Sequence, residues 1–315
     1  MTDLKQVLTP DEVAVFTLRA LYSEYGYSQY KMSKFEEYEL YVRNKDFLVS
    51  DNVITFTDTD GRLLALKPDV TLSIIKNNKD NPDGLIKAQY NENVYRISGS
   101  THSFGELMQV GLECIGSVGD KEITEVLLLA SKSLDSISEN NLLAVSQLDV
   151  VEGLMDYAEV SREGKKKILS ALGQKNLSAI NEALAAEGVD GEKAALIASL
   201  CEIYGTPDKV LPALQKFRVN EKASLAIDGL SRIMKALSDF GVSKISIDFS
   251  LVGNMNYYNG IAIRGFVEGI PQGVISGGQY DNLMRKMGRK SKAIGFAVYL
   301  DEIDRLPSVK GGARE

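Results

Sequence analysis

Residues 90–116 read YNENVYRISGSTHSFGELMQVGLECIG. The first arm, around residues 94–97, combines β-branched and aromatic side chains, which predicts a strand. A polar turn with two glycines follows, and the second arm then alternates between two sides with the period of a strand. One side holds Leu107, Gln109, Gly111 and Glu113, and the other holds Met108, Val110, Leu112 and Cys114. These residues alone fit either an ordinary half-exposed hairpin or a sheet whose mixed face lines a small polar pocket.

Other short stretches stand in order around this hairpin. Residues 66–71 read LKPDVT, residues 254–260 read NMNYYNG and residues 277–281 read GGQYD. Together with the hairpin they resemble the motifs of histidyl-tRNA synthetases, which are class II enzymes. The hairpin is similar to motif 2 (YxGPVFR, a loop, then REFxQxGxExxG), and the other stretches resemble LRPEGT, RGLDYYxG and GGRYD. Residues 18–40 and 293–297 are similar to motifs 1 and 3, except that Ser33 replaces the proline of motif 1.

The rest of the chain separates into mixed and helical parts. Residues 9–12 form a capping-box pattern that opens a helix, and TDG at 59–61 predicts a turn between two strands. Residues 122–138 have helical spacing and 142–149 read as a strand. Helices are then expected at 165–172, 177–186, 192–204, 207–217 and 221–239, and strands return at 244–250, 261–266 and 274–276.

These patterns and the resemblance imply an α+β fold. We expect the antiparallel sheet of a class II aminoacyl-tRNA synthetase, flanked by helices and carrying an all-helical insertion. The core would take residues 1–149 and 241–315, and the insertion residues 150–240. The anticodon-binding domain that follows this core in histidyl-tRNA synthetases is not expected.

Composition narrows the classes of function. The 315 residues carry a formal net charge of −7 and are 44% hydrophobic. This balance does not favour a tRNA partner, because nucleic-acid binders rely on basic surfaces. One histidine and two cysteines without a CxxC pair make a metal site unexpected, and no cofactor is implied. Without a long apolar run or a signal-peptide pattern, we expect a cytoplasmic protein without a membrane segment.

By resemblance, eight positions correspond to the family's contacts to histidine. They are Asp69, Thr71, Arg96, Gln109, Glu113, Tyr257, Tyr258 and Tyr280. Asp69, Thr71 and Gln109 would face the ammonium group, while Glu113 and Tyr258 would face the two imidazole nitrogens. Helix capping is the alternative role for the residues at 69 and 71, and strand packing is the alternative for the tyrosines at 257 and 258.

The motif 2 arginine is kept as Arg96, but other arginines with which the synthetases bind their substrates are replaced. Guanidinium groups bind carboxylates and phosphates with two parallel hydrogen bonds. Two of the family's arginine positions fall on Gly253 and Gln279, and the motif 3 arginine falls on Glu302, whose carboxylate would repel phosphate. A basic stretch at 285–292 is expected to be a solvated loop, with a substitute phosphate site as the alternative.

A retained histidine pocket beside a dismantled ATP site looks like the regulatory subunits of ATP phosphoribosyltransferase. The resemblance implies a non-catalytic chain that dimerises, joins a short catalytic subunit in a hetero-octamer and is needed for the first step of histidine biosynthesis. L-histidine would be its effector, with feedback inhibition as the outcome. The alternatives are a repurposed tRNA-binding module and an active histidyl-tRNA synthetase.

Overall fold

A computed structural model describes residues 7–48, 53–97, 104–252 and 257–303. The hairpin of residues 90–116 is confirmed as strands β5 (Leu85–Ile97) and β6 (Phe104–Gly116), which pair antiparallel from Leu85↔Gly116 to Ile97↔Phe104. The tip of the hairpin, with the histidine at position 102, lies outside the described residues.

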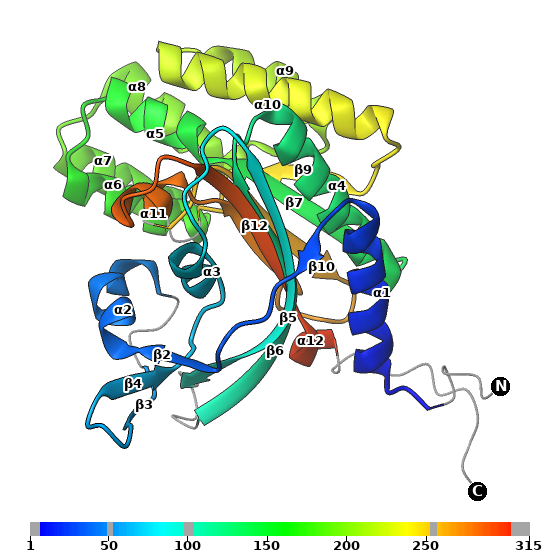
Figure 1. Ribbon diagram of the computed structural model, residues 1–315. Helices are drawn as coiled ribbons and strands as arrows, with labels where there is room; N and C mark the ends of the chain where they lie inside the picture. Colours follow the sequence, from blue (N-terminus) through cyan, green and yellow to red (C-terminus); the bar gives the residue numbers. More distant parts are fainter. Residues whose placement is uncertain (1–6, 49–52, 98–103, 253–256, 304–315) are drawn as a thin grey trace, which may run out of the picture.

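The strands within these ranges form one nine-stranded and one three-stranded sheet (Figure 1). In the large sheet the spatial order is β1-β5-β6-β12-β11-β10-β7-β9-β8, and its pairs are antiparallel except for β1 with β5 and β7 with β9. The strands not yet bounded are β1 (Ser28–Gln29), β12 (Lys292–Tyr299), β11 (Ile275–Gln279), β10 (Asn259–Val267), β7 (Asn141–Gln147), β9 (Ile245–Asp248) and β8 (Tyr204–Gly205). The small sheet has the order β2 (Phe35–Glu37), β4 (Leu63–Leu66), β3 (Thr55–Thr57), which confirms the strand pair expected around 59–61.

Helices cover both faces of the large sheet. On one face α1 (Pro10–Glu24) and α4 (Asp120–Ile137) pack over the apolar side of β6, and the hydroxyls of Tyr22 and Ser133 lie 2.9 Å apart between them. On the other face lie α2 (Tyr38–Arg43), α3 (Thr71–Asn77) and α11 (Asp281–Lys286), in a separate apolar cluster with Tyr90 and Tyr280. The expected α+β architecture, a mostly antiparallel sheet flanked by helices, is therefore confirmed.

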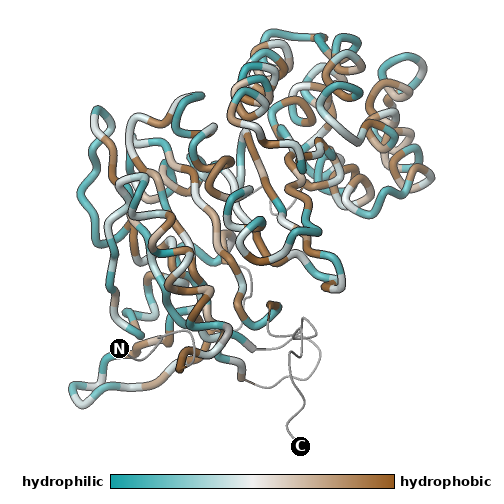
Figure 2. The backbone as a smooth tube through the Cα atoms, turned by 90° about the vertical axis from the view of Figure 1, so that its right-hand side faces the viewer, coloured by the Kyte–Doolittle hydropathy of each residue, from teal (hydrophilic) through white to brown (hydrophobic). Residues whose placement is uncertain are grey.

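Residues 148–240 are mostly helical. They contain α5 (Leu148–Tyr157), α6 (Arg162–Gly173), α7 (Leu177–Ala186), α8 (Gly191–Ala198), α9 (Pro207–Ala213) and α10 (Glu221–Asp239). Figure 2 shows these helices gathered beside the sheet, with hydrophobic and hydrophilic positions alternating along them. The strand expected at 142–149 ends at Gln147, whose side chain caps α5, and Tyr204, the last residue of the helix expected at 192–204, lies in strand β8. The basic stretch at 285–292, expected to be a solvated loop, begins in α11 and ends at the start of β12.

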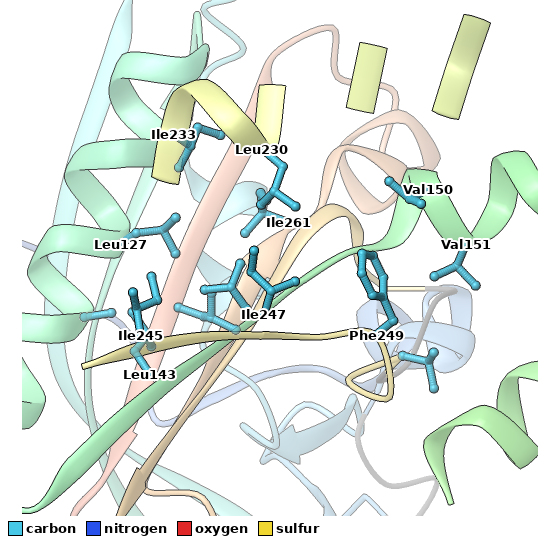
Figure 3. Packing of buried hydrophobic residues seen from close by; sticks show 14 of the residues in the cluster. Leu127, Leu143, Val150, Val151, Leu230, Ile233, Ile245, Ile247, Phe249 and Ile261 are labelled. Atoms are coloured by element: carbon cyan, nitrogen blue, oxygen red, sulfur yellow. The ribbon is translucent and has the colours of Figure 1, made fainter. Parts of the chain in front are cut away.

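The helical segment shares its core with the sheet (Figure 3). Leu230 and Ile233 of α10 lie in the same buried cluster as Leu127 of α4 and the sheet residues Ile247 and Ile261. The division into a core and an insertion at residues 150–240 stays a prediction. No helix in the described ranges is long and apolar enough to cross a lipid bilayer.

Candidate functional site

A cavity of about 710 Å³ lies on the sheet face that carries α3 and α11. All eight positions expected to contact histidine line it, although they come from four separate stretches of sequence. They are Asp69, Thr71, Arg96, Gln109, Glu113, Tyr257, Tyr258 and Tyr280. The structure therefore brings these residues together, and their contact with histidine remains to be tested.

Strand register builds the floor of this cavity. Residues on alternate positions of a strand share one face, so directly paired residues stand in rows across the sheet. One such row crosses five strands. It consists of Tyr90, Gly111, Ala297, Ser276 and Arg264. The three small residues in the middle leave open space above the sheet, between larger side chains at its two ends.

Glu113 lies deep in the cavity and is 2% exposed. Its two carboxylate oxygens accept hydrogen bonds from Thr71 Oγ1 at 2.7 Å and from the Tyr280 hydroxyl at 2.6 Å. Burial nevertheless raises the pKa of Glu113 to about 8, and nearby Asp69 contributes in the same direction. A cation or a hydrogen-bond donor that binds beside a buried carboxyl of this kind offsets the free-energy cost of burying it.

Gly295 provides the room for this carboxylate. A Cβ atom at Gly295 would lie 1.8 Å from Glu113 Oε2, on the neighbouring strand. In the next row, a Cβ at Gly111 would lie 2.4 Å from the Tyr90 hydroxyl. The two glycines therefore let large polar side chains lie flat over the sheet.

Asp69 stands at the start of α3 and carries out the capping that its sequence position suggested. Its Oδ1 accepts a hydrogen bond from the Leu72 amide at 2.9 Å, while burial raises its pKa and the nearby Arg96 opposes that shift. Arg96 Nε donates to the Pro68 carbonyl at 3.0 Å. Capping does not exclude a ligand, because Asp69 also lines the cavity.

Gln109 has an incomplete set of hydrogen bonds. Its side chain is 3% exposed, and its Nε2 has no partner among the described residues. An unpaired buried donor costs about 1–3 kcal/mol. Because Gln109 lines the cavity, a ligand with an acceptor oxygen at this point would remove that cost.

Three tyrosines form one aromatic wall of the cavity. The ring of Tyr257 lies with its centroid 4.7 Å from that of Tyr258 and 6.0 Å from that of Tyr280. Burial raises the pKa of all three phenols well above the ordinary value, so they are neutral hydrogen-bonding groups at physiological pH. The stretch before them, which includes position 253, lies outside the described residues.

The replaced synthetase positions take structural or electrostatic roles. Gln279 Oε1 accepts a hydrogen bond from the Ile261 amide at 2.8 Å, at a shift in the register between β10 and β11. Glu302 lines the cavity together with Asp301, and Asp301 Oδ2 accepts from the Met108 amide at 3.1 Å. Neither Gln279 nor Glu302 offers the guanidinium group with which an arginine binds phosphate.

Some lining residues were not anticipated from the sequence. They are, among others, Tyr90, Arg264, Ser276 and Tyr299. The signal for Arg264 was present, because Ile261 and Ile263 alternate toward the core and leave the arginine on the opposite face. A signal for Tyr90 was present as well, because Tyr90 and Arg96 are separated by an even number of positions on β5 and therefore share one face of the strand.

Comparison with known proteins supports both the fold and its lineage. A family profile described as histidyl-tRNA synthetase matches residues 9–303. An ATP phosphoribosyltransferase regulatory subunit from a Thermoanaerobacter species is 32% identical over 291 residues, covering 90% of this chain and 75% of that protein. One from Acetivibrio thermocellus is 28% identical over 300 residues, covering 91% of this chain and 70% of that protein.

Among solved structures, an ATP phosphoribosyltransferase regulatory subunit/histidyl-tRNA synthetase from Bacillus halodurans superposes with a TM-score of 0.83 at 23% identity. The match covers 97% of this chain and 82% of that one. A chain of the ATP phosphoribosyl transferase (HisG:HisZ) complex from Thermotoga maritima superposes with a TM-score of 0.72 at 20% identity, and 93% and 97% of the two chains are covered. These likenesses establish the fold.

Proposed function

Because the chain belongs to the ATP phosphoribosyltransferase regulatory subunits, a family with the histidyl-tRNA synthetase fold, we propose that it is a non-catalytic partner of a short ATP phosphoribosyltransferase. In this role it is required for the activity of the catalytic subunit in the first step of histidine biosynthesis. It also makes that step sensitive to L-histidine. The identity of 32% over most of the chain supports the assignment.

Eight side chains converge on one cavity, and this convergence is the observation that supports binding of L-histidine. Glu113, held by Thr71 and Tyr280, offers a buried carboxyl to the imidazole. Asp69 and the oxygen of Gln109 suit the ammonium group, since both are acceptors. A cavity of about 710 Å³ has space for a free amino acid.

We expect the synthetase reaction to be absent, because residues that cannot bind phosphate as arginines do replace several of its arginines. Glu302 lines the cavity at the position that resembles the motif 3 arginine, and Gln279 accepts a hydrogen bond from the Ile261 amide within the sheet. Removing one transition-state donor typically costs about 10²–10³ in rate, and at least two arginine positions are replaced. We therefore expect no exchange of pyrophosphate into ATP in the presence of histidine. Detectable exchange would contradict this part of the proposal and favour an active synthetase.

The catalytic partner and the assembly are proposed from the similarity of this chain to its relatives. The names of the relatives and of the Thermotoga maritima complex support a hetero-oligomer with a catalytic subunit. We propose a hetero-octamer built on self-dimers of this chain. Light scattering of the mixed subunits tests the stoichiometry. A gel shift with tRNA tests the alternative partner, and we expect no shift.

Reconstitution with a short catalytic subunit tests the function directly. We expect the chain to raise the turnover of that subunit, and L-histidine to lower it again. A coupling free energy of about 1–3 kcal/mol between the two sites would give useful inhibition. Glu113→Ala should keep the activation but lose the inhibition, whereas Glu182→Ala, at an exposed carboxylate on α7, should keep both. Activation without any response to L-histidine would restrict the function to activation.

A further inference from the structure

The proposed ligand is a zwitterion, and the assignments above leave its carboxylate without a cation. The inner end of the cavity is acidic, with Glu113 and Asp69. The α-carboxylate of the ligand would be repelled by these acidic groups, so it needs a positively charged partner in another part of the cavity. Among the described lining residues the cations are Arg96 and Arg264.

Arg96 is already engaged at the acidic end. Its Nε donates to the Pro68 carbonyl, and its charge lowers the pKa of Asp69 against the effect of burial. It therefore compensates the carboxylate that would hold the ammonium group. Arg264 has no such engagement, because no described residue pairs with its guanidinium through a hydrogen bond or an ion pair.

The register of the sheet places Arg264 at a suitable position. The carboxylate of Glu113 lies over Gly295 on β12, and Arg264 stands two strands further along, on β10. Two interstrand spacings correspond to about 10 Å. The interval between them is floored by Ser276 and Ala297, which leave space for a molecule the size of an amino acid.

The stem of Arg264 is supported from one side. A Cβ atom at Gly273 would lie 2.7 Å from Arg264 Cγ and 3.0 Å from its Nε, so the side chain lies directly against the backbone of residue 273. The residue is exposed to solvent, which places its head group where the cavity opens. On the inner side, the unpaired Nε2 of Gln109 supplies a second donor.

From these observations we propose that Arg264, together with Gln109 Nε2, binds the α-carboxylate of the amino acid and makes the cavity select an amino acid over the corresponding amine. The assignment rests on the proposed function and names a specificity-determining residue for it. A planar guanidinium suits a carboxylate because it can donate two parallel hydrogen bonds.

The test compares L-histidine with histamine, which has the same ring and ammonium group but no carboxylate. Calorimetry on the intact chain should show that wild type prefers L-histidine. Arg264→Met should weaken L-histidine binding about 10- to 100-fold and leave histamine within about twofold. The affinity of Arg264→Lys for L-histidine should lie between that of wild type and that of Arg264→Met. Arg162→Met, at an exposed arginine on α6, should change neither affinity.

Two results would overturn the assignment while leaving the proposed function intact. One is unchanged binding of L-histidine by Arg264→Met. The other is an equal loss of both ligands, which would indicate a general effect on the cavity. Failure of wild type to bind L-histidine at all would instead reject the histidine part of the proposed function, and this assignment with it. Circular dichroism of each variant confirms that the chain is folded.

Discussion

Glu113 combines a binding role with a cost in stability. Its pKa is about 8 in the folded chain, while an unfolded chain ionises near the ordinary value of 4.5. Between these pH values the folded state keeps a proton that the unfolded state releases. Stability therefore falls as pH rises from about 4.5 to 8 on account of this group.

We expect Glu113→Gln to remove that dependence. As pH rises from 5 to 8, the variant should become more stable relative to wild type by roughly 1–3 kcal/mol, because an amide takes up no proton on folding. Urea denaturation followed by circular dichroism at both pH values measures the difference. Glu182→Gln is the matched exposed control and should show no such gain. An equal effect of Glu113→Gln at both pH values would contradict the raised pKa.

The affinity for L-histidine should depend on pH in a related way. A free imidazole loses its proton near pH 6.5, whereas Glu113 loses its proton near pH 8. Between these values the free partners hold one proton in total, and a Glu113–imidazole pair also holds one. Affinity should therefore be flat across this window and fall by up to tenfold per pH unit below it, because one proton must then be released. Calorimetry from pH 5.5 to 8 tests this, and an affinity that increases below pH 6 would contradict the pairing.

The sequence predicted many, but not all, of the residues that line the cavity. The eight positions carried over from the resemblance all line it, because each belongs to a motif with fixed spacing. Arg264 was not predicted to line the cavity because it lies outside those motifs, in a strand whose other residues are mostly apolar. The free donor of Gln109 could not be predicted either, since it depends on the positions of its neighbours.

Among the elements, the glycines of β6 and β12 determine whether the cavity can hold a carboxylate. We expect Gly295→Ala to displace Glu113, because the new methyl would lie 1.8 Å from Oε2 and 2.5 Å from the Leu112 carbonyl. The variant should lose L-histidine binding and be destabilised by about 1–3 kcal/mol through overpacking. Calorimetry and thermal unfolding measure the two effects.

A glycine on a helix provides the comparison. Gly229 lies within α10, where a Cβ would meet only Arg232 Nη2, at 3.8 Å. Gly229→Ala should therefore stabilise the chain by about 0.5–1 kcal/mol and leave binding unchanged. If Gly295→Ala bound L-histidine like wild type, Glu113 would not be fixed in the place described here.

One element that the sequence did not reveal is α5. Its sequence, LDVVEGLMDY, continues the apolar run of β7, and Gly153 interrupts the helical pattern. The structure explains the glycine: a Cβ there would lie 3.0 Å from that of Ala223, and the Gly153 carbonyl accepts a hydrogen bond from Asn220 Nδ2 at 2.7 Å. The approach of α10 requires the glycine, and a contact between residues so far apart in sequence leaves no local signal.

For the whole molecule, the question is whether the helical segment folds independently. The helical pattern of residues 150–240 distinguishes them from the rest of the chain. The pattern does not indicate how these helices pack against the sheet. Leu230 of α10 is fully buried in the cluster that also contains Leu127 and Ile247. Since one apolar core connects the segment and the sheet, we expect a single cooperative unfolding transition.

Leu230→Ala tests this expectation. Truncating the buried side chain should destabilise the chain by about 2–5 kcal/mol, because a cavity is left in the shared core. Far-UV circular dichroism follows the helices, and near-UV dichroism follows the tyrosines, since the chain has 14 tyrosines and no tryptophan. Both signals should shift together. Leu225→Ala, on the same helix but 62% exposed, should shift neither by much. Separate transitions, with only the helical one moved, would instead mark the segment as an independent folding unit attached to the sheet.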